Sequence, residues 1–580
     1  MSQSGNSVQS IPALLQARAQ SNKTAQRVKR LGLWQKITWR EHVLSVNAMA
    51  AKLVELGVKK GDKIGLLSEN RPEWLVSDLA IQSLGAITVG VYSTSSPKQL
   101  HYVLEHSQSS GLILENAEQL EKWFEIEEEL PNINWVIVIE PEGFSGLLSW
   151  ENAMEEGKKL FQNNPKKIEE SIKNVRQSDT CLLMYTSGTT GYPKAVMLSH
   201  KNMLWAAGVL VQTLGYNEND EIISYLPLSH VVERGGSYAA IKAGFTTSFV
   251  ENLDTFAYNL QEIRPTVLFA VPRIWEKMHS LVELHMRENH FFKRAMYNWA
   301  TANLSERSQA SLLANLTVIK WLKYRLGLDR LRLAISGAAP ISPQILAYFR
   351  FLGIDLREGY GMTENSGLTS LHQGLFKYGT VGTAFPGVSI KIAEDGEILT
   401  RSDGTMQGYY RDKEATDEVI VGGWLHSGDI GEFDEDGQLK ITDRKKDIII
   451  TAGGKNIAPQ KIENLLKSSI FINDAVVIGD KRKYLVALLV LDEDNISQWA
   501  AEQQLSYTTY SDLASHEEVY KLIEKDVGAA NKQLARVETI KKFAILPKRL
   551  YYEDGEVTAT LKVKRSSISK KYADLIESLY

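Results

Sequence analysis

CLLMYTSGTTGYPKAVMLSH, residues 181–200, holds an unbroken run of glycine, serine and threonine between two apolar segments. The run consists of Thr186, Ser187, Gly188, Thr189, Thr190 and Gly191, and Lys194 follows three residues later. Glycine lets the backbone approach a bulky anion and present several N–H groups to it. The hydroxyl groups add hydrogen-bond donors, and the lysine adds a compact positive charge. The sequence therefore predicts a loop that binds a polyphosphate.

This loop differs from the common nucleotide-binding P-loop. The P-loop has the pattern G-x-x-x-x-G-K-[ST] and opens directly onto a helix. Here the glycines stand at 188 and 191, and the residues after Lys194 are expected to form a strand, with a helix only after Ser199. Taken alone, the run also fits a flexible polar hairpin loop without a ligand.

Composition narrows the function classes. The 580 residues are 43% hydrophobic and 23% charged, with a net charge of −4, which is the balance of a soluble globular protein. The length has room for about three to five compact units. A nucleic-acid partner would favour a basic excess, which is missing. Two readings stay open for the basic cluster near the C-terminus, a solvated face or a role with phosphates: Lys562, Lys564, Arg565, Lys570 and Lys571.

The chain has one cysteine, Cys181, which lies inside an apolar run and is expected to be a buried strand residue. One cysteine allows neither a disulfide framework nor a cysteine-based metal site, and it favours a reducing compartment. The N-terminus lacks the apolar region of a signal peptide, and no apolar run approaches the ~18 residues of a spanning helix. We expect a cytoplasmic protein with at most peripheral membrane contact.

Short apolar runs alternate with amphipathic stretches along most of the chain. KIGLLSE (63–69), TVLFAVP (266–272) and RLRLAIS (330–336) are predicted strands, and residues 72–86 are a predicted helix. Another helix should start at Ser342, a good N-cap, with Pro343 in the first helical position. This alternation indicates an α/β architecture with largely parallel sheets.

The character of the sequence changes near residue 444. The stretch 429–450 is dense in charge, and beyond it come a predicted helix, IENLLKSS, and two predicted hairpin strands, DAVVIGD and YLVALLVLDED. We interpret this region as a small α+β domain. The expected domains are 1–445 and 446–580, with the linker at 444–447.

YTSGTTGYPKAVMLSH resembles the signature of the adenylate-forming (AMP-binding) superfamily, which includes acyl-CoA synthetases, peptide-synthetase adenylation domains and luciferases. The resemblance extends from about residue 10 to 575. One departure is Ala195, where the pattern often has glycine. Further motifs of the family follow in order: LPLSH (226–230), SGAAP (336–340), EGYGMTE (358–364), GEI (396–398), HSGD (426–429), DRKKDII (443–449) and LKVKR (561–565).

The resemblance implies a fold and a reaction. The fold is a large N-terminal domain of stacked, mostly parallel sheets with helices, followed by a small, mobile α+β domain. The reaction has two halves, in which a carboxylate and ATP give an acyl-AMP and pyrophosphate, and a thiol then displaces AMP. This chemistry needs charge neutralisation on the phosphates, Mg²⁺, and an in-line approach to the α-phosphorus.

The resemblance also implies how ATP is held. Thr363 would contact the α-phosphate, and Glu364 would hold Mg²⁺ with the Thr186 hydroxyl close by. Hard carboxylate oxygen suits Mg²⁺, which takes one or two protein ligands besides phosphates. Asp429 would accept both ribose hydroxyls beside Arg444. The remaining nucleotide contacts are the adenine wall with its stacking tyrosine and the residues around them: Gly337, Ala338, Ala339, Glu358, Gly359, Tyr360, Gly361 and Met362.

Other matched positions concern the acyl group and the second half-reaction. His230 would lie beside the acyl site, although a satisfied core histidine is the alternative. Lys446 matches the hinge on which the C-terminal domain rotates. Gly453 and Gly454 resemble the loop on the coenzyme A side, and a glycine turn is the alternative there. Lys562 aligns with the catalytic lysine that reaches the α-phosphate and the substrate carboxylate.

LPLSHVVER, GGKNIAP and VPRIWEKMH look most like long-chain fatty acyl-CoA synthetases, including the very-long-chain branch. A fatty acid is thus the implied substrate, although apolar pocket residues could also hold an aromatic or medium-chain acid. The chain shows no Gly-x-Asp-Ser site for a phosphopantetheine arm, so the thiol must come from another molecule. Coenzyme A is the first expectation and an acyl carrier protein the second. A binding protein without catalysis is disfavoured, since Glu364, Lys194 and Lys562 are all present.

Lys562→Ala should abolish adenylation but leave the conversion of supplied acyl-AMP to thioester, because only the first half needs its charge. ATP–pyrophosphate exchange and thioester formation from synthetic acyl-AMP measure the halves separately. Lys564→Ala is the matched control, two residues away on the same face of an extended segment. Intact exchange in Lys562→Ala with lost exchange in Lys564→Ala would show that the alignment is displaced by two residues.

Overall fold

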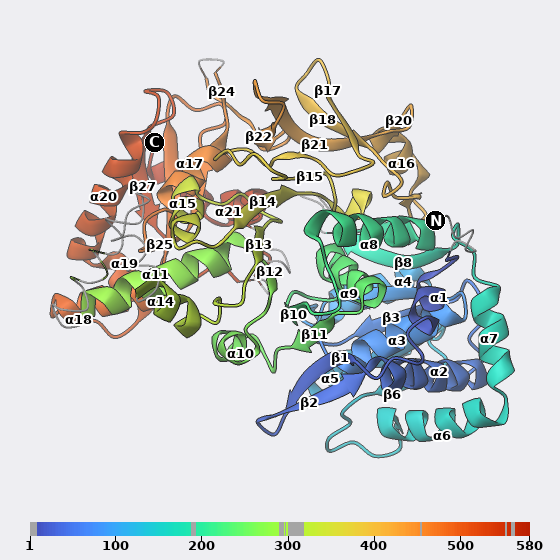
Figure 1. The fold of residues 1–580 in the computed structure, drawn as a ribbon. Helices are drawn as coiled ribbons and strands as arrows, with labels where there is room; N and C mark the ends of the chain where they lie inside the picture. Colours follow the sequence, from blue (N-terminus) through green and yellow to red (C-terminus); the bar gives the residue numbers. More distant parts are fainter. Residues whose placement is uncertain are drawn as a thin grey trace.

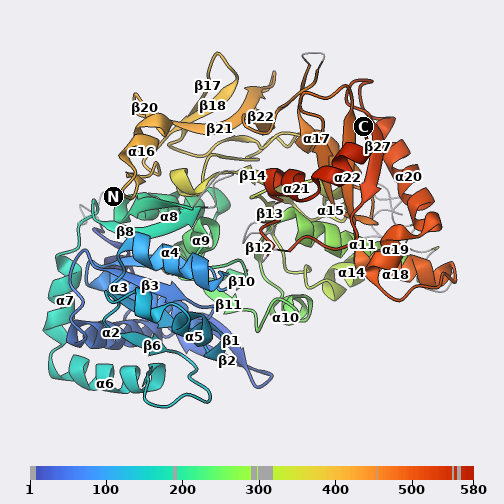
Figure 2. The same ribbon diagram turned by 180° about the vertical axis from the view of Figure 1, so that it is seen from behind.

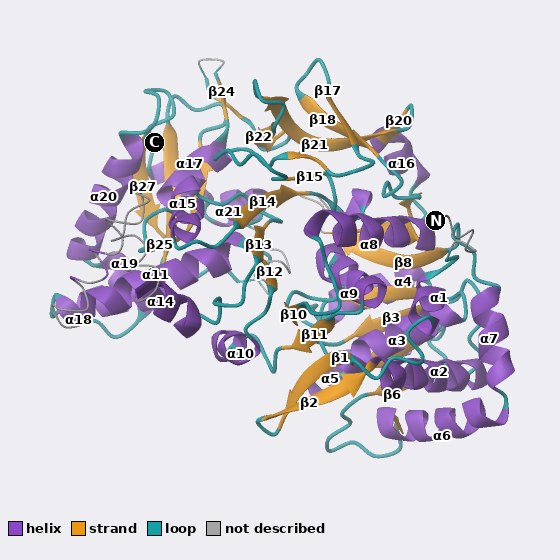
Figure 3. Ribbon diagram, viewed as in Figure 1, coloured by secondary structure: helices purple, strands orange, loops and turns teal. Residues whose placement is uncertain are grey.

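The computed structural model describes residues 8–186, 193–288, 295, 297, 299, 318–452, 455–551, 554–557 and 563–580. Figure 1 shows the N-terminal sheets and helices on one side and the C-terminal strands and helices on the other. The α/β class predicted from the sequence is confirmed, with helices packed around several sheets (Figure 3). Within the described residues, no helix combines the length and apolar character that a membrane crossing needs.

An eight-stranded sheet forms the centre of the N-terminal part. Its first pairs are antiparallel, and from the third strand of the order onward all pairs are parallel. Neighbouring residues of one strand, Leu182 and Leu183, enter different apolar clusters, so both faces of the sheet are covered. In order the strands are β19 (Gly408–Tyr409), β9 (Lys194–Ser199), β8 (Thr180–Thr186), β4 (Ile87–Val91), β3 (Lys63–Leu67), β5 (Gly111–Leu114), β6 (Val136–Val138) and β7 (Leu148–Ser149).

Helices cover each face of this sheet. One face carries α4 (Pro97–Ser107) and α5 (Ala117–Phe124), followed by the short η1 (Glu127–Glu129). The opposite face carries α1 (Ile11–Gln16), α2 (Trp39–Glu55), α3 (Pro72–Ser83), α6 (Trp150–Asn163), α7 (Pro165–Lys173), α8 (His200–Leu214) and α9 (Val231–Ala243).

A second sheet has the order β10 (Glu221–Ser224), β11 (Thr246–Phe249), β1 (Thr24–Arg30) and β2 (Leu33–Thr38). Its first two pairs are parallel, and β1 and β2 form an antiparallel hairpin. A third sheet joins the parallel strands β12 (Val267–Ala270), β13 (Leu333–Ser336) and β14 (Leu356–Tyr360) to antiparallel β15 (Ser370–Leu371) and β16 (Thr383–Ala384).

The helices of this region flank the third sheet. The helix predicted from Ser342 is confirmed, since the Ser342 side chain caps α15 and Pro343 opens it. The set comprises α10 (Phe256–Ile263), α11 (Pro272–Glu288), α14 (Lys320–Arg325), α15 (Pro343–Phe351) and the short η3 (Thr363–Asn365).

A fourth sheet departs from the expected parallel pattern, because all of its pairs are antiparallel. Its strands are joined by tight turns in which Gly396 and Gly437 adopt positive φ, and such short links permit only antiparallel neighbours. The strands are β17 (Ser389–Ile392), β18 (Glu397–Arg401), β21 (Trp424–Phe433), β20 (Ile420–Val421) and β22 (Leu439–Arg444), with α16 (Lys413–Val419) beside them.

The C-terminal part has its own three-stranded sheet with an apolar cluster on each face. The predicted helix and hairpin are present as α17 (Pro459–Leu466), β25 (Ile472–Ile478) and β26 (Leu485–Leu491). The other elements are β23 (Ile449–Ile450), β24 (Asn456–Ile457), α18 (Glu493–Glu502), α19 (Tyr510–Ser515), α20 (Glu517–Asn531), β27 (Ile540–Ile545), α21 (Arg565–Lys571) and α22 (Ala573–Ser578).

A buried ion pair joins α3 to α9. The Arg234 guanidinium donates to Asp78 at 2.7 Å, and both side chains are almost wholly buried. Gln82 and Tyr238 donate to the same carboxylate, at 2.7 and 2.8 Å. Arg234 also lies 4.1 Å above the Trp74 ring, so its charge is satisfied on several sides.

Asp78→Asn should lower the free energy of unfolding by about 3–5 kcal/mol, because it leaves the Arg234 charge buried without its counter-ion. Urea unfolding followed by tryptophan fluorescence measures the change. Asp403→Asn is the control, since the Lys201–Asp403 pair is more than half exposed and its loss should cost about 1 kcal/mol or less. Equal losses in the two variants would contradict this assignment.

Candidate nucleotide and acyl site

The ends of β8 and β9 hold the predicted phosphate loop between them. Thr186 pairs with Lys194 across the hairpin, and its Oγ1 donates to the Lys194 carbonyl at 3.4 Å. The strand after Lys194 and the helix capped by Ser199 confirm that this loop does not open onto a helix as a P-loop does. The loop residues Ser187, Gly188, Thr189, Thr190 and Gly191 lie outside the described residues.

Lys194 is partly exposed at the start of β9. Its Nζ lies 5.0 Å from the centre of the Tyr409 ring and 3.9 Å from Asp412 Oδ2. These contacts hold a cation at the start of β9 without neutralising it by a close ion pair. The ammonium group is therefore placed to meet an anion.

Glu364 lies buried in η3, on the other side of the same tyrosine. The Tyr409 hydroxyl donates to Glu364 Oε1 at 2.9 Å. Burial raises the pKa of Glu364, and the hydrogen bond from Tyr409 opposes that rise. Tyr409 reaches this place because β19 pairs with β9, where it stands opposite Val196. One side chain thus connects the predicted metal ligand to the predicted phosphate lysine.

Tyr409 was not among the residues predicted from the sequence. Its only local signal is the Gly-Tyr-Tyr run at 408–410, which resembles an ordinary turn. Tyr409 is positioned by the pairing of β19 with β9, which joins distant parts of the chain. A local sequence pattern therefore cannot predict its role.

Three predicted nucleotide residues meet at the edge of the fourth sheet. The Tyr360 hydroxyl donates to Asp429 Oδ2 at 2.5 Å, and Arg444 Nε lies 3.2 Å from Asp429 Oδ1. The register of β21 and β22 places Asp429 directly opposite Arg444. Burial and the neighbouring Asp429 carboxylate raise the pKa of Tyr360 well above its usual value, so it stays a neutral donor.

The predicted adenine wall lies where β13 ends beside β14. A Cβ at Gly337 would stand 3.1 Å from the Gly359 carbonyl, so the two backbones pack closely. Ala338 has φ +68°, a left-handed conformation that costs energy for a residue with a Cβ. A Cβ at Gly361 would lie 2.0 Å from the Gly367 carbonyl, so only glycine fits there.

The other predicted residues of these loops flank the wall. Ala339 is exposed, whereas Met362 and Thr363 are half-buried just before Glu364. Glu358 is buried, and burial raises its pKa to about 8. Its carboxyl group is therefore largely neutral at pH 7 and can donate as well as accept a hydrogen bond.

His230 caps the N-terminus of α9, where its Nδ1 accepts from the Val232 N–H at 3.3 Å. The ring is half-buried rather than locked in a core. The preceding residues are held from two sides. Asn70 Nδ2 donates to the Leu226 carbonyl at 2.6 Å, and Arg234 Nε donates to the Leu228 carbonyl at 3.0 Å. The buried ion pair thus fixes the segment that presents His230.

The predicted hinge residue Lys446 lies in an exposed turn at 445–447, between β22 and β23. Arg444, placed in the linker by the sequence, is instead the last residue of β22, because it pairs with Asp429. Asp443, also on β22, accepts from the Gln460 N–H at 3.3 Å in the first turn of α17. Burial raises the pKa of Asp443 to about 6.

The basic cluster near the C-terminus is not simply solvated. Arg565 pairs with Glu463 at 2.7 Å, and Lys571 pairs with Glu556 at 2.8 Å. These two cations therefore serve packing within the C-terminal part. Three predicted residues, Gly453, Gly454 and Lys562, lie outside the described residues.

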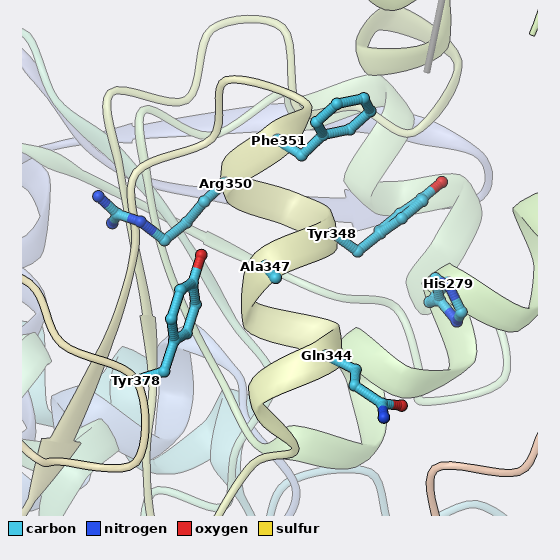
Figure 4. Close-up of a pocket in the computed structure, with 7 residues that line it drawn as sticks. All are labelled: His279, Gln344, Ala347, Tyr348, Arg350, Phe351 and Tyr378. Carbon is cyan, nitrogen blue, oxygen red and sulfur yellow. The ribbon is translucent and has the colours of Figure 1, made fainter. Parts of the chain in front are cut away.

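An open depression of about 650 Å³ lies along α15, away from the predicted site residues (Figure 4). Figure 4 shows its labelled side chains on two sides of the helix, so the space is an open surface rather than one enclosed pocket. Its described lining does not coincide with the predicted nucleotide residues: His279, Gln344, Ala347, Tyr348, Arg350, Phe351 and Tyr378.

The sequence matches two models of known families. Residues 15–410 match the AMP-binding enzyme family, and residues 446–580 match the AMP-binding enzyme C-terminal domain. A long-chain-fatty-acid–CoA ligase, FadD15 of Mycobacterium bovis, is 35% identical over 95% of this chain and 93% of its own. A long-chain-fatty-acid–CoA ligase of Xenopus laevis, ACSBG2, is 32% identical over 94% of this chain and 80% of its own.

Solved structures share the fold at lower identity. The anthranilate CoA ligase AuaEII, in complex with anthranoyl-AMP, aligns with a TM-score of 0.74 at 21% identity, covering 100% of both chains. The A–PCP didomain of a carboxylic acid reductase from Segniliparus rugosus, in complex with AMP, aligns with a TM-score of 0.76 at 20% identity, covering 100% of this chain and 82% of its own.

Tyr409→Phe should lower the rate of ATP–pyrophosphate exchange about 10–100-fold and raise the Mg²⁺ concentration needed for half-maximal exchange, because it removes a hydrogen bond to a buried carboxylate. The ring that faces Lys194 is kept. Tyr410→Phe is the matched control, since the Tyr410 hydroxyl meets only the exposed Gln108 at 3.3 Å among the described contacts. If both variants kept the same Mg²⁺ dependence as the unmodified protein, Tyr409 would not position Glu364.

Proposed function

The chain belongs to the AMP-binding enzyme family, and on that premise we propose that it joins a long-chain fatty acid to coenzyme A at the expense of ATP. The products are the acyl-CoA thioester, AMP and pyrophosphate. The convergence of Tyr360, Asp429 and Arg444 on one side with Lys194 and Glu364 on the other carries this proposal. The long-chain-fatty-acid–CoA ligases among its relatives suggest the substrate.

The nucleoside end is held by Asp429. A carboxylate offers about four lone-pair positions. Tyr360 and Arg444 each use one position on a different oxygen, so each oxygen keeps room for one ribose hydroxyl. The Tyr360 ring, fixed by its own hydroxyl, then lies against one face of adenine, while the close-packed backbone at Gly337 and Ala338 supplies the other.

The triphosphate end is held by the loop from Thr186 to Lys194. In the first half-reaction a carboxylate oxygen of the acid attacks the α-phosphorus, and the bond to the bridging oxygen of pyrophosphate breaks. The Lys194 charge stabilises the departing pyrophosphate, and the Thr363 hydroxyl meets the α-phosphate. Such preorganised donors act in the transition state without having to rearrange.

Glu364 and Thr186 fit Mg²⁺ by the chemistry of their donors, a carboxylate and a hydroxyl oxygen. Held by these two side chains, Mg²⁺ would supply positive charge to the phosphates. Among the described residues no group of three or more histidine, cysteine, aspartate or glutamate side chains forms a separate metal cluster. An ion held by one or two side chains would be completed by phosphate oxygens.

The second half-reaction breaks the bond between the acyl carbon and the AMP oxygen as the thiol sulfur attacks that carbon. Lys562 stabilises the first half, and rotation at Lys446 replaces it with the loop of Gly453 and Gly454, beside which the thiol enters. The only cysteine cannot be the nucleophile, because Cys181 is fully buried in β8 and burial raises its pKa. The acceptor is therefore a separate thiol.

The acyl chain enters beside His230. The preceding Leu226 packs against one apolar cluster and Leu228 belongs to another, so this segment lies between two apolar regions. An aliphatic chain is the matching ligand. Asn70 and Arg234 hold this segment through hydrogen bonds to its backbone.

ATP–pyrophosphate exchange should depend on added fatty acid and increase from short to long chains, since each added methylene buries more apolar surface. With coenzyme A the product should be the acyl-CoA thioester, which mass spectrometry identifies. Glu364→Gln should reduce exchange by about 10²-fold, the order of loss seen when a catalytic electrostatic partner is removed.

The absence of exchange across all chain lengths would exclude this function. Exchange without thioester on coenzyme A, but with transfer to an acyl carrier protein, would favour the alternative of an acyl-AMP ligase that serves a carrier.

A further inference from the structure

The tip of the β1–β2 hairpin combines exposed leucine side chains with a backbone conformation that is unfavourable for leucine. Leu31 is 101% exposed and Leu33 is 72% exposed. Leu31 and Gly32 form the two-residue turn, and both have positive φ, +49° and +77°. Such turns ordinarily carry Asn-Gly or Asp-Gly, because leucine is strained there. The apolar side chain at the tip thus has no explanation within the folded chain.

The hairpin lies in a basic part of the sequence. Residues 1–40 contain seven lysines and arginines and no aspartate or glutamate, whereas the whole chain has a net charge of −4. Acids of other elements offset some of these charges, since Arg27 pairs with Glu221 and Lys29 with Glu262. Lys36 is exposed, and Arg30 stays half-exposed although it contacts Glu73. The tip is therefore flanked by cations that face solvent.

The face of the hairpin next to the tip carries a tryptophan among basic residues. Trp34 stands opposite Lys29, and Lys36 stands opposite Arg27, so all four side chains share one face. The Arg27 guanidinium lies 4.9 Å from the centre of the Trp34 ring. An apolar tip followed by tryptophan and then by cations is the order of a membrane interface, from hydrocarbon through headgroups to water.

We propose that this hairpin docks the protein on a membrane containing anionic lipid, with Leu31 and Leu33 entering the apolar layer and Arg30 and Lys36 meeting lipid phosphates. Figures 1 and 2 show the hairpin reaching outward from the body of the molecule, where it can contact a flat surface. The neighbouring α10 region widens the contact, because Leu253 is 61% and Tyr258 is 70% exposed there. Trp34 Nε1 donates to Glu262 on α10 at 2.9 Å and holds the two parts together.

The docking element is continuous with the predicted acyl segment. The hairpin and β10 belong to one sheet, and β10 leads directly into residues 226–230. Trp34 and Leu226 pack against the same apolar cluster. A membrane that dissolves long-chain acids would thus lie beside the element that presents them. Docking itself does not rest on the proposed function.

Vesicle sedimentation tests the proposal with the full chain. The unmodified protein should sediment with vesicles of phosphatidylglycerol and phosphatidylcholine in equal parts, and less with phosphatidylcholine alone. Leu31→Asn combined with Leu33→Ser should weaken binding at least tenfold, while the Asn-Gly turn suits the hairpin and preserves folding. Exchange with detergent-dissolved fatty acid should not change. Leu375→Ser combined with Val421→Ser, which removes exposed apolar groups elsewhere, should bind like the unmodified protein.

A second measurement reports where the tip goes. Cys181 is fully buried, so Leu31→Cys offers a single accessible thiol for a polarity-sensitive dye. The dye emission should shift to the blue on addition of the mixed vesicles and should shift less at high salt. No shift, or equal vesicle binding by the tip variant and the unmodified protein, would overturn the proposal. A tip-dependent dimer in light scattering, without vesicle binding, would assign the tip to a second copy of the chain instead.

Discussion

The antiparallel pairing of β8 with β9 sets the positions of Thr186 and Lys194, which begin and end the predicted phosphate loop. It brings Thr186 and Lys194 directly opposite each other at the ends of the two strands. β9 has a second edge, and β19 occupies it. That second pairing places Tyr409 in contact with both Lys194 and Glu364, so one side chain joins the predicted phosphate lysine to the predicted metal ligand.

The nucleoside end depends on a different sheet but on the same kind of constraint. Asp429 and Arg444 are opposite residues of two antiparallel strands, and Tyr360 reaches Asp429 from the end of β14. Two side chains, each from a different strand, thus share the Asp429 carboxylate. Because the carboxylate is buried and already hydrogen-bonded, it has little freedom to turn, and the predicted nucleoside ligand would meet acceptors that are already in place.

Local features of the fold follow from the sequence, and long-range ones do not. The helices capped by Ser199 and Ser342 are signalled within three residues of their starts, and the buried strands are signalled by short apolar runs. The resemblance of separate motifs to the family predicted Glu364, Tyr360 and Asp429 as individual site residues. The sequence could not show that Tyr409 binds Glu364, that Arg444 still belongs to a strand, or that the fourth sheet is antiparallel, because these depend on pairings between distant segments. The roles of all the predicted site residues, the loop after Thr186 and Lys562 included, remain predictions.

Asp443 lies where the N-terminal and C-terminal parts of the chain meet, and its protonation depends on how the two parts are arranged. Its carboxyl group, on β22, is buried against the first turn of α17, and burial raises its pKa to about 6. Any movement that takes α17 away returns this group to water, where its pKa falls toward the ordinary value and the proton is released. Acidity below about pH 6 therefore favours the arrangement seen here, and above that pH the preference disappears. A rearrangement of the C-terminal part that exposed Asp443 would therefore be linked to pH through this one carboxyl group.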